Sequence, residues 1–248
     1  MEFCVIAPAA GLQRYATLSK SHLVLSHVKN ALYREFYRQR AKEGDLIILD
    51  NGAYEGELNE QELLEAIAFY MPKVIVLPDI LLGDSRLSLE RSVEFHERWR
   101  DKLKVEWMFV PQAKPNHIHE FTEILLEGIR RIKPKWVGLP RILATHLALP
   151  TNKNYIRADY CRLVKGFYPD INVHALGMAA GNIIDLDNLR DAGCQSIDSS
   201  APVWRGWNGF SLSDPSWEVA GSALNFNAPP LESERRHQLI LSNLGKCL

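Results

Sequence analysis

Four polar side chains of this sequence stand at or near the ends of short apolar runs. Asp50 lies in LIILDN (46–51), Asp79 in KVIVLPD (73–79), Gln112 in EWMFVPQ (106–112) and Asp198 in SIDSS (196–200). Two carboxylates in one pocket suit glycosyl chemistry, because one can attack an anomeric carbon while the other handles the proton of the leaving group. Asp198 and Asp50 are the candidates for this pair.

The remaining polar groups suit recognition of a flat heterocycle. The Asp79 carboxylate can accept from paired N–H donors, and the Gln112 carboxamide offers both a donor and an acceptor. Gly138 would let a backbone N–H approach a ligand closely, and Tyr54 could stack on a ring. The alternative for each Asp is a turn or helix-capping role, and for Tyr54 it is ordinary packing under a loop.

These residues need a scaffold that brings strand ends together. Short β-rich runs alternate with amphipathic stretches, which predicts a parallel sheet. About eight such units predict a single (β/α)8 TIM barrel over residues 1–248, with a doubly wound open sheet as the alternative. The connection 8–22 is too short for a regular helix, and 232–248 is expected to be a closing helix. The predicted strands are 3–8, 22–27, 46–51, 73–79, 106–112, 136–141, 172–178 and 196–200, and the predicted helices include 59–71, 88–103, 118–132 and 185–193.

Composition restricts the class of protein. The chain has 248 residues, a formal net charge of -1 and 46% hydrophobic residues, as expected for a globular domain with a sizeable core. We expect a cytoplasmic protein with no membrane partner, because no apolar run is long enough to span a bilayer and no basic segment precedes the apolar N-terminus. The cysteines at 4, 161, 194 and 247 are scattered, so we expect neither a metal site nor disulfides.

The order of the motifs resembles a known family. LDNGAY, VLPD, FVPQ, VGLP, HALGM and IDSSAPVWRGWNG follow one another over roughly residues 46–209, and this ordered set is similar to the tRNA-guanine transglycosylase superfamily. The resemblance implies a (β/α)8-barrel pentosyltransferase that exchanges guanine in a polynucleotide for a 7-deazaguanine base. The co-substrate would be a free base such as preQ0 or preQ1, without a further cofactor.

The resemblance also assigns roles. Asp198 matches the nucleophile that attacks C1′ of the ribose, and Asp50 matches the acid/base that manages the proton on the ring nitrogen of the base. Asn51 stands where the family has a serine beside that group. The other matched positions surround the base: Asp79, Gln112 and the Gly138 backbone at its edge, and Tyr54 and Leu176 on its two faces.

The sequence departs from the family pattern at positions that are expected to contact the polynucleotide. Trp204 and Trp207 stand where the family has arginines, and Arg205 is displaced by one position. The zinc module that the family carries after this stretch is not found, which favours DNA over tRNA by resemblance to the DNA 7-deazaguanine transglycosylases (DpdA-like). A helper protein is a further possible partner.

Several residues are candidates for contact with nucleic acid. Trp204, Arg205 and Trp207 could stack on bases or contact the backbone, or pack as a loop on the barrel rim. Arg141 ends the basic run RRIKPKWVGLPR (130–141) and is its best candidate for a phosphate contact. His174 is expected to be a hydrogen-bonded supporting group. The alternative functions are a non-catalytic nucleic-acid-binding barrel subunit and an unrelated retaining glycosidase.

Overall fold

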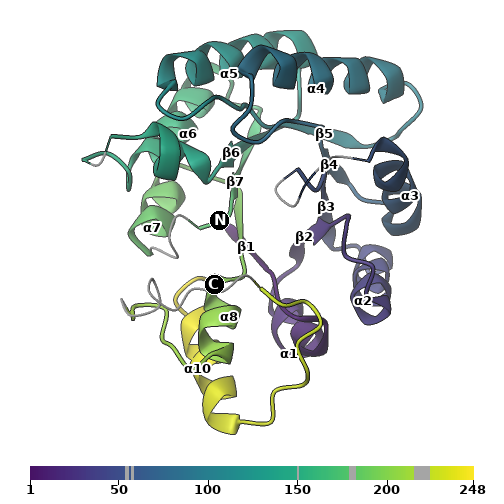
Figure 1. The fold of residues 1–248 in the computed structure, drawn as a ribbon, viewed down its shortest axis with the longest axis vertical. Helices are drawn as coiled ribbons and strands as arrows, with labels where there is room; N and C mark the ends of the chain where they lie inside the picture. Colours follow the sequence, from purple (N-terminus) through teal and green to yellow (C-terminus); the bar gives the residue numbers. More distant parts are fainter. Residues whose placement is uncertain (54–55, 57–58, 150, 179–182, 215–223) are drawn as a thin grey trace.

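The structure is a computed structural model that describes residues 1–53, 56, 59–149, 151–178, 183–214 and 224–248. Within these residues eight parallel strands form one nearly closed barrel, in the order β1-β8-β7-β6-β5-β4-β3-β2 (Figure 1). The two ends of this order, β1 and β2, lie in contact. The predicted (β/α)8 barrel is therefore confirmed.

The strands are short and their ends differ from the predicted ones. They are β1 (Glu2–Val5), β2 (Ser21–Leu25), β3 (Leu46–Asp50), β4 (Val74–Val76), β5 (Glu106–Phe109), β6 (Trp136–Pro140), β7 (Asn172–Leu176) and β8 (Ser196–Ser199). Asp79 and Gln112, predicted as the last residues of strands, lie in the loops that follow β4 and β5. These loop positions still place both side chains at the carboxyl end of the barrel.

Most strands are followed by a helix that covers the outside of the barrel (Figure 1). Side-chain caps start four of these helices, at Asn30, Asn59, Asp84 and Ser233. The helices are α1 (Leu12–Tyr15), α2 (Ala31–Lys42), α3 (Glu60–Tyr70), α4 (Ser85–Trp99), α5 (Ile118–Ile132), α6 (Ile156–Phe167), α7 (Ile183–Asp191), α8 (Ala201–Trp207) and α10 (Glu234–Leu244). The sequence analysis specified neither α2 nor α6, and α8 replaces the expected aromatic loop.

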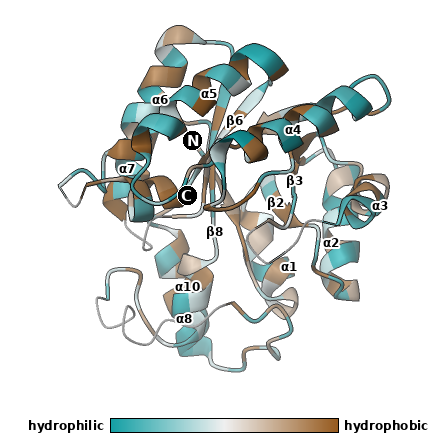
Figure 2. Cartoon of the chain, turned by 45° about the horizontal axis from the view of Figure 1, so that its top comes forward, coloured by the Kyte–Doolittle hydropathy of each residue, from teal (hydrophilic) through white to brown (hydrophobic). Residues whose placement is uncertain are grey.

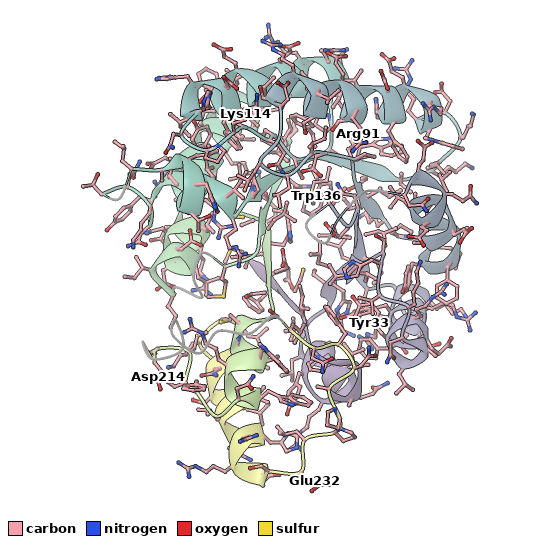
Figure 3. The ribbon with its side chains drawn as sticks, viewed as in Figure 1. Tyr33, Arg91, Lys114, Trp136, Asp214 and Glu232 are labelled. Carbon is pink, nitrogen blue, oxygen red and sulfur yellow. The ribbon has the colours of Figure 1, made fainter. Side chains whose placement is uncertain are left out.

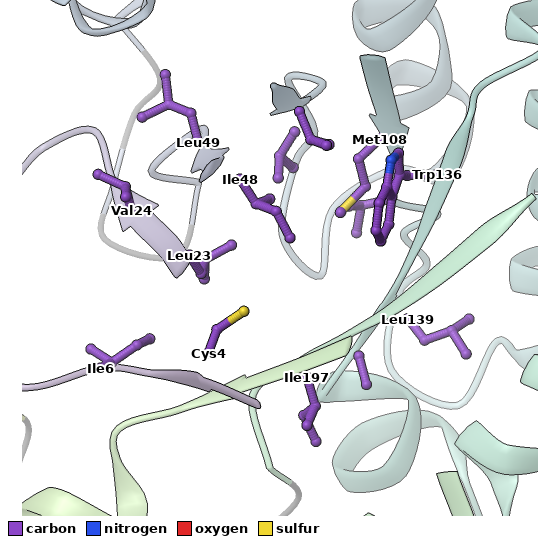
Figure 4. Packing of buried hydrophobic residues seen from close by; sticks show 14 of the residues in the cluster. Cys4, Ile6, Leu23, Val24, Ile48, Leu49, Met108, Trp136, Leu139 and Ile197 are labelled. Carbon is purple, nitrogen blue, oxygen red and sulfur yellow. The ribbon is translucent and has the colours of Figure 1, made fainter. Parts of the chain in front are cut away.

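The barrel interior is filled by apolar side chains. Cys4, Leu23, Ile48 and Met108 are all buried and come from four different strands (Figure 4). Trp136 lies inside the ring of helices (Figure 3), where its indole N–H donates to Glu106 Oε2 at 2.6 Å. The strand residues are nearly all buried, whereas much of α4 on the outside of the molecule is hydrophilic (Figure 2). Among the described residues no helix is long and apolar enough to cross a membrane.

The first connection is irregular, as predicted, and the chain's last helices close the barrel beside it. Only two 3-10 turns and the four-residue α1 join β1 to β2. Helix α10 packs against α8, and Tyr15 of α1 meets Trp207 of α8 edge to face at 6.5 Å. Tyr15 also hydrogen-bonds His237 of α10. Helices α8 and α10 therefore occupy space that the short α1 leaves uncovered.

Gly206 permits the close approach of α8 and α10. A Cβ at this position would lie 2.9 Å from both the Ile240 backbone N and Cα, closer than real Cβ contacts. Gly206→Ala is expected to cost about 1–3 kcal/mol of unfolding free energy, because the two backbones must separate. Chemical denaturation measures this cost.

The matched control is Gly166→Ala in α6, where a Cβ would meet nothing within 4 Å. That change should leave stability unchanged or raise it by up to about 1 kcal/mol, since Ala favours helix over Gly. Equal effects of the two substitutions would contradict the proposed close packing.

Candidate active site

Asp198 is a buried carboxylate at the carboxyl end of β8. Its Oδ1 accepts the backbone N–H of Gly177 at 3.0 Å and contacts Nε2 of His174 at 3.1 Å. Within the described part of the chain, every hydrogen bond of Asp198 falls on Oδ1, so Oδ2 is the oxygen available for an attack. Burial raises the pKa of the Cys4 thiol on β1, and the neighbouring Asp198 charge raises it further.

His174 on β7 orients this carboxylate. Its ring is fully buried, and Nδ1 lies 2.7 Å from the Ser196 hydroxyl. A neutral imidazole with the proton on Nε2 satisfies both contacts, since it donates to Asp198 and accepts from Ser196. The predicted supporting position of His174 agrees with this geometry.

A buried ion pair fixes the turn that holds Asp198. Arg157 of α6 is fully buried and pairs with Asp185 of α7. Its Nη1 donates to the carbonyls of Gly177 at 2.7 Å and Leu176 at 3.2 Å. Gly177 has φ +71, a conformation that favours glycine. The guanidinium thus secures the peptide segment whose N–H binds Asp198.

The sequence analysis missed Arg157 and Asp185. A signal was present, because Arg157 shares the helix face of the buried residues Cys161 and Val164, three to four residues apart. A cation on an apolar helix face needs a buried partner. Asp185 gives no comparable signal in the sequence.

A second polar cluster comprises Asn51, Asp79 and Gln112, all of them buried. Asn51 Nδ2 donates to Asp79 Oδ1 at 2.6 Å and to the Leu77 carbonyl at 2.7 Å. Gln112 Nε2 donates to Asp79 Oδ2 at 2.5 Å. The structure therefore joins three predicted base-binding residues directly, and the Asn51 contacts account for the amide at that position.

Among the described residues, one buried acceptor of this cluster has no hydrogen-bond partner. Gln112 Oε1 is buried and makes no hydrogen bond with any described residue. Buried polar atoms are almost always paired, so such an oxygen marks a position for a donor on a ligand. Burial also raises the pKa of Asp79 to about 6, although its two amide donors favour the ionised form.

Asp50 lies at the end of β3 in a different setting. It is half-buried, and its Oδ2 accepts the Gly52 backbone N–H at 3.0 Å, so it also serves the turn. Two strands, β1 and β2, lie between β3 and β8 around the barrel. Asp50 and Asp198 therefore stand on strands three positions apart around the same mouth of the barrel.

Gly138 and Leu176 lie side by side on β6 and β7. A Cβ on Gly138 would approach Val110 Cγ2 to 2.7 Å and Leu176 Cδ1 to 3.1 Å. These atoms are the ends of side chains, which would have to shift to admit a larger residue, and the role of the Gly138 N–H toward a base stays a prediction. Leu176 is half-buried. Tyr54, the other predicted side of the clamp, lies outside the described residues.

The burial of Trp204, Arg205 and Trp207 favours the alternative of packing on the barrel rim over contact with nucleic acid. Trp204, Arg205 and Trp207 are only 9%, 5% and 7% exposed, because α8 is packed against α1 and α10. Arg205 Nη1 donates to the Leu212 carbonyl. These side chains hold the closing helices together and present no open ring face to a base.

The basic run 130–141 is divided between the two ends of the barrel. Arg130 and Lys133 lie at the end of α5, and Lys135 precedes β6, so all three are at the end opposite the mouth. Arg141 follows β6 at the mouth, is exposed, and has its Cβ and Cδ within 4 Å of the position a Gly177 Cβ would take. Only Arg141 of this run can act beside the candidate site.

The geometry defines a class: a (β/α)8-barrel protein whose mouth holds a buried, oriented carboxylate and a separate amide–carboxylate cluster. No protein-family model matches this chain, and no curated protein matches it either. In the described part of the chain no group of three or more His, Cys, Asp or Glu side chains is arranged to hold a metal ion.

Asp79 should make stability depend on pH. Its carboxyl has a pKa of about 6 in the folded protein, against an ordinary pKa of 3.8. The folded state therefore binds more protons between about pH 4 and 6, so stability falls as pH rises through this window, by about 3 kcal/mol in full. Asp79→Asn should flatten that fall in urea-unfolding measurements.

Asp84→Asn is the matched control. Asp84 is an exposed carboxylate whose pKa is lowered from 3.8, chiefly by the Leu87 backbone N–H. Its stabilising contribution is lost only as pH falls below this window, so the fall between pH 4 and 6 should persist. An unchanged profile in Asp79→Asn would contradict the assigned burial cost.

Arg157 and Asp185 should be strongly coupled. Arg157→Met or Asp185→Leu alone leaves one buried charge without its partner and should cost about 3–5 kcal/mol, whereas the two substitutions together should recover much of this loss. Urea unfolding of the four proteins gives the coupling energy. The exposed Arg162–Asp159 pair on the same helix, with 3.0 Å between charged atoms, is the control and should contribute less than about 1 kcal/mol. Additive losses in the buried pair would refute the coupling.

Proposed function

We propose that this protein is a base-exchange transglycosylase that replaces guanine in a polynucleotide, with DNA favoured, by a 7-deazaguanine derivative. The observation that carries the proposal is the arrangement around Asp198. One carboxylate oxygen is held by Gly177 and His174, which leaves the second oxygen for the sugar. The base-binding cluster lies at the same mouth.

The first displacement forms a covalent intermediate. The target guanosine leaves its stack and enters the mouth of the barrel. Asp198 Oδ2 attacks C1′ as the bond from C1′ to the guanine ring nitrogen breaks. Asp50, protonated at this stage, gives its proton to the departing nitrogen. The ester between Asp198 and C1′ then holds the sugar that has lost its base, while the backbone of the polynucleotide stays intact.

The second displacement restores the glycosidic bond. The incoming 7-deazaguanine gives its ring N–H proton to Asp50 and attacks C1′, and Asp198 leaves as a carboxylate. Asp50 thereby regains the proton that it lost in the first step. Two inversions retain the configuration at C1′.

One set of groups can read both bases. Guanine and 7-deazaguanine share an edge that carries a ring N–H and an amino group, both hydrogen-bond donors. The Asp79 carboxylate and Gln112 Oε1 are acceptors in the buried cluster, and acceptors are what this edge requires. Leu176, and Tyr54 by resemblance, would cover the faces of the ring.

The polymer and the incoming base are proposed by resemblance. The motif order is similar to the tRNA-guanine transglycosylase superfamily, within which DNA is the favoured polymer and tRNA is the alternative. Free preQ0 or preQ1 is the proposed co-substrate, with no further cofactor, and a helper protein is a possible partner. The assay below therefore includes both polymers and both bases.

Asp198→Asn tests the nucleophile with the fold preserved. The amide keeps an oxygen for Gly177 and His174 and replaces only Oδ2 by a group that cannot form the ester. Incorporation of labelled preQ0 or preQ1 into DNA or tRNA, followed by mass spectrometry, should fall by about 10⁴-fold or more. Asp191→Asn, an exposed site on α7, should exchange bases like the wild type.

Three outcomes would overturn parts of the proposal. Normal labelling by Asp198→Asn would remove Asp198 as the nucleophile. A wild-type protein that binds polynucleotide but exchanges no base would instead support the non-catalytic barrel subunit. Release of sugar from an oligosaccharide, without base exchange, would support a glycosidase.

A further inference from the structure

Two neighbouring loops at the mouth carry cations without carboxylates. Residues 112–119 follow β5 and residues 141–158 follow β6, and neither stretch contains an Asp or Glu, although the chain as a whole has a net charge of -1. Lys114, Arg141 and Lys153 are the lysines and arginine exposed in these stretches, and we call them the basic rim. A local excess of positive charge attracts an anionic partner.

The structure joins these loops into one surface. The Asn116 backbone N–H donates to the His146 carbonyl at 3.0 Å, which ties the loop after β5 to the loop after β6. Asn188 Nδ2 of α7 donates to the Asn154 carbonyl at 3.0 Å, which ties the second loop to the next helix. Lys114 lies at the β5 side of this surface, beside α5 (Figure 3).

The basic rim borders the candidate site. Arg141 follows the last residue of β6, and its side chain lies against Gly177, the residue whose N–H binds Asp198. Lys114 follows Gln112 by two residues. The same two loops thus touch the proposed nucleophile's support and the base-binding cluster. Lys114 lies near two carboxylates, Asp84 at 3.4 Å and Glu120, and surface pairs of this kind are weak in water.

An aromatic side chain completes the surface. Tyr155 stands immediately before α6 and is 49% exposed, and Leu149 in the same loop is 73% exposed. Helix α6 begins at the carboxyl ends of the strands, so Tyr155 faces the mouth side of the molecule. An exposed ring among cations is the pattern of surfaces that bind single-stranded nucleic acid.

We propose that the basic rim and Tyr155 bind a single-stranded segment of polynucleotide next to the nucleotide that enters the mouth. Lys114, Arg141 and Lys153 contact its phosphates, and Tyr155 stacks on a flanking base. The choice of partner rests on the proposed function, whereas the binding surface rests on the two loops. In this proposal the polynucleotide contacts the basic rim and Tyr155 rather than α8, whose tryptophans are buried.

The opposite end of the barrel supplies a matched control. Arg130, Lys133 and Lys135 are exposed near the amino end of β6. Replacement of these three by Gln removes the same charge as Lys114→Gln, Arg141→Gln and Lys153→Gln together. The two triple variants therefore differ only in the end of the barrel that loses charge.

The experiment is a salt titration of binding to a fluorescent single-stranded oligonucleotide, with DNA and RNA as separate probes. Each phosphate contact adds about 0.7 to the slope of log affinity against log salt for single strands, so the rim triple variant should lower the slope by about 2. Its affinity at low salt should fall by more than tenfold. The control triple variant should match the wild type in both measurements.

The stacking contact is tested separately on α6. Tyr155→Ala should weaken binding by about tenfold at an unchanged salt slope, because the ring carries no charge. Phe167→Ala is its control, since Phe167 is 73% exposed at the far end of the same helix. Equal effects of these two substitutions would remove Tyr155 from the binding surface.

The binding surface and the catalytic proposal can fail independently. All binding measurements are repeated in Asp198→Asn, where no exchange occurs. If the rim triple variant binds more weakly but the wild type exchanges no base, the proposed binding surface stands and the proposed reaction is overturned. Equal binding by the rim and control triple variants, or no binding by the wild type, would overturn the surface even if base exchange is observed.

Discussion

Parallel strand direction is the constraint on which the rest of this molecule depends. Because every strand returns through a crossover on the outside, the carboxyl ends of all the strands must meet at one end of the barrel. That end gathers Asp50, Asp79, Gln112 and Asp198, which are up to 148 residues apart in the sequence. Site residues far apart along the chain become neighbours without any long-range sequence signal of their own.

The burial of these polar groups then decides how each can act. Water no longer satisfies them, so each must find a partner in the protein or hold a place for a ligand. Asp198 finds Gly177 and His174, and the Arg157–Asp185 pair supports the Gly177 turn. Asp79 finds two amide donors, whereas Gln112 Oε1 remains unpaired with any described residue.

The irregular start of the barrel has consequences at its other terminus. A four-residue α1 cannot cover β1 and β2 alone, and the tryptophans of α8 fill that place together with α10. Trp204 and Trp207, which the sequence suggested as contacts for nucleic acid, are therefore used in packing. The exposed cations near the site lie on the loops after β5 and β6, in two stretches whose own sequence contains no Asp or Glu.

The sequence by itself determined the alternation of strands and helices, the irregular first connection and the polar residues that follow the strands, because these depend on local periodicity and turn chemistry. The sequence identified Asn51, Asp79 and Gln112 as candidate site residues, but it did not predict the hydrogen bonds between them. Only the tertiary structure decided the partner of Arg157, the burial of Trp204 and Trp207, and the end of the barrel on which each part of the run 130–141 lies. The physical reason is that the local sequence pattern shows which residues need a contact partner. The packing of elements that are distant in the sequence determines which partner each residue contacts.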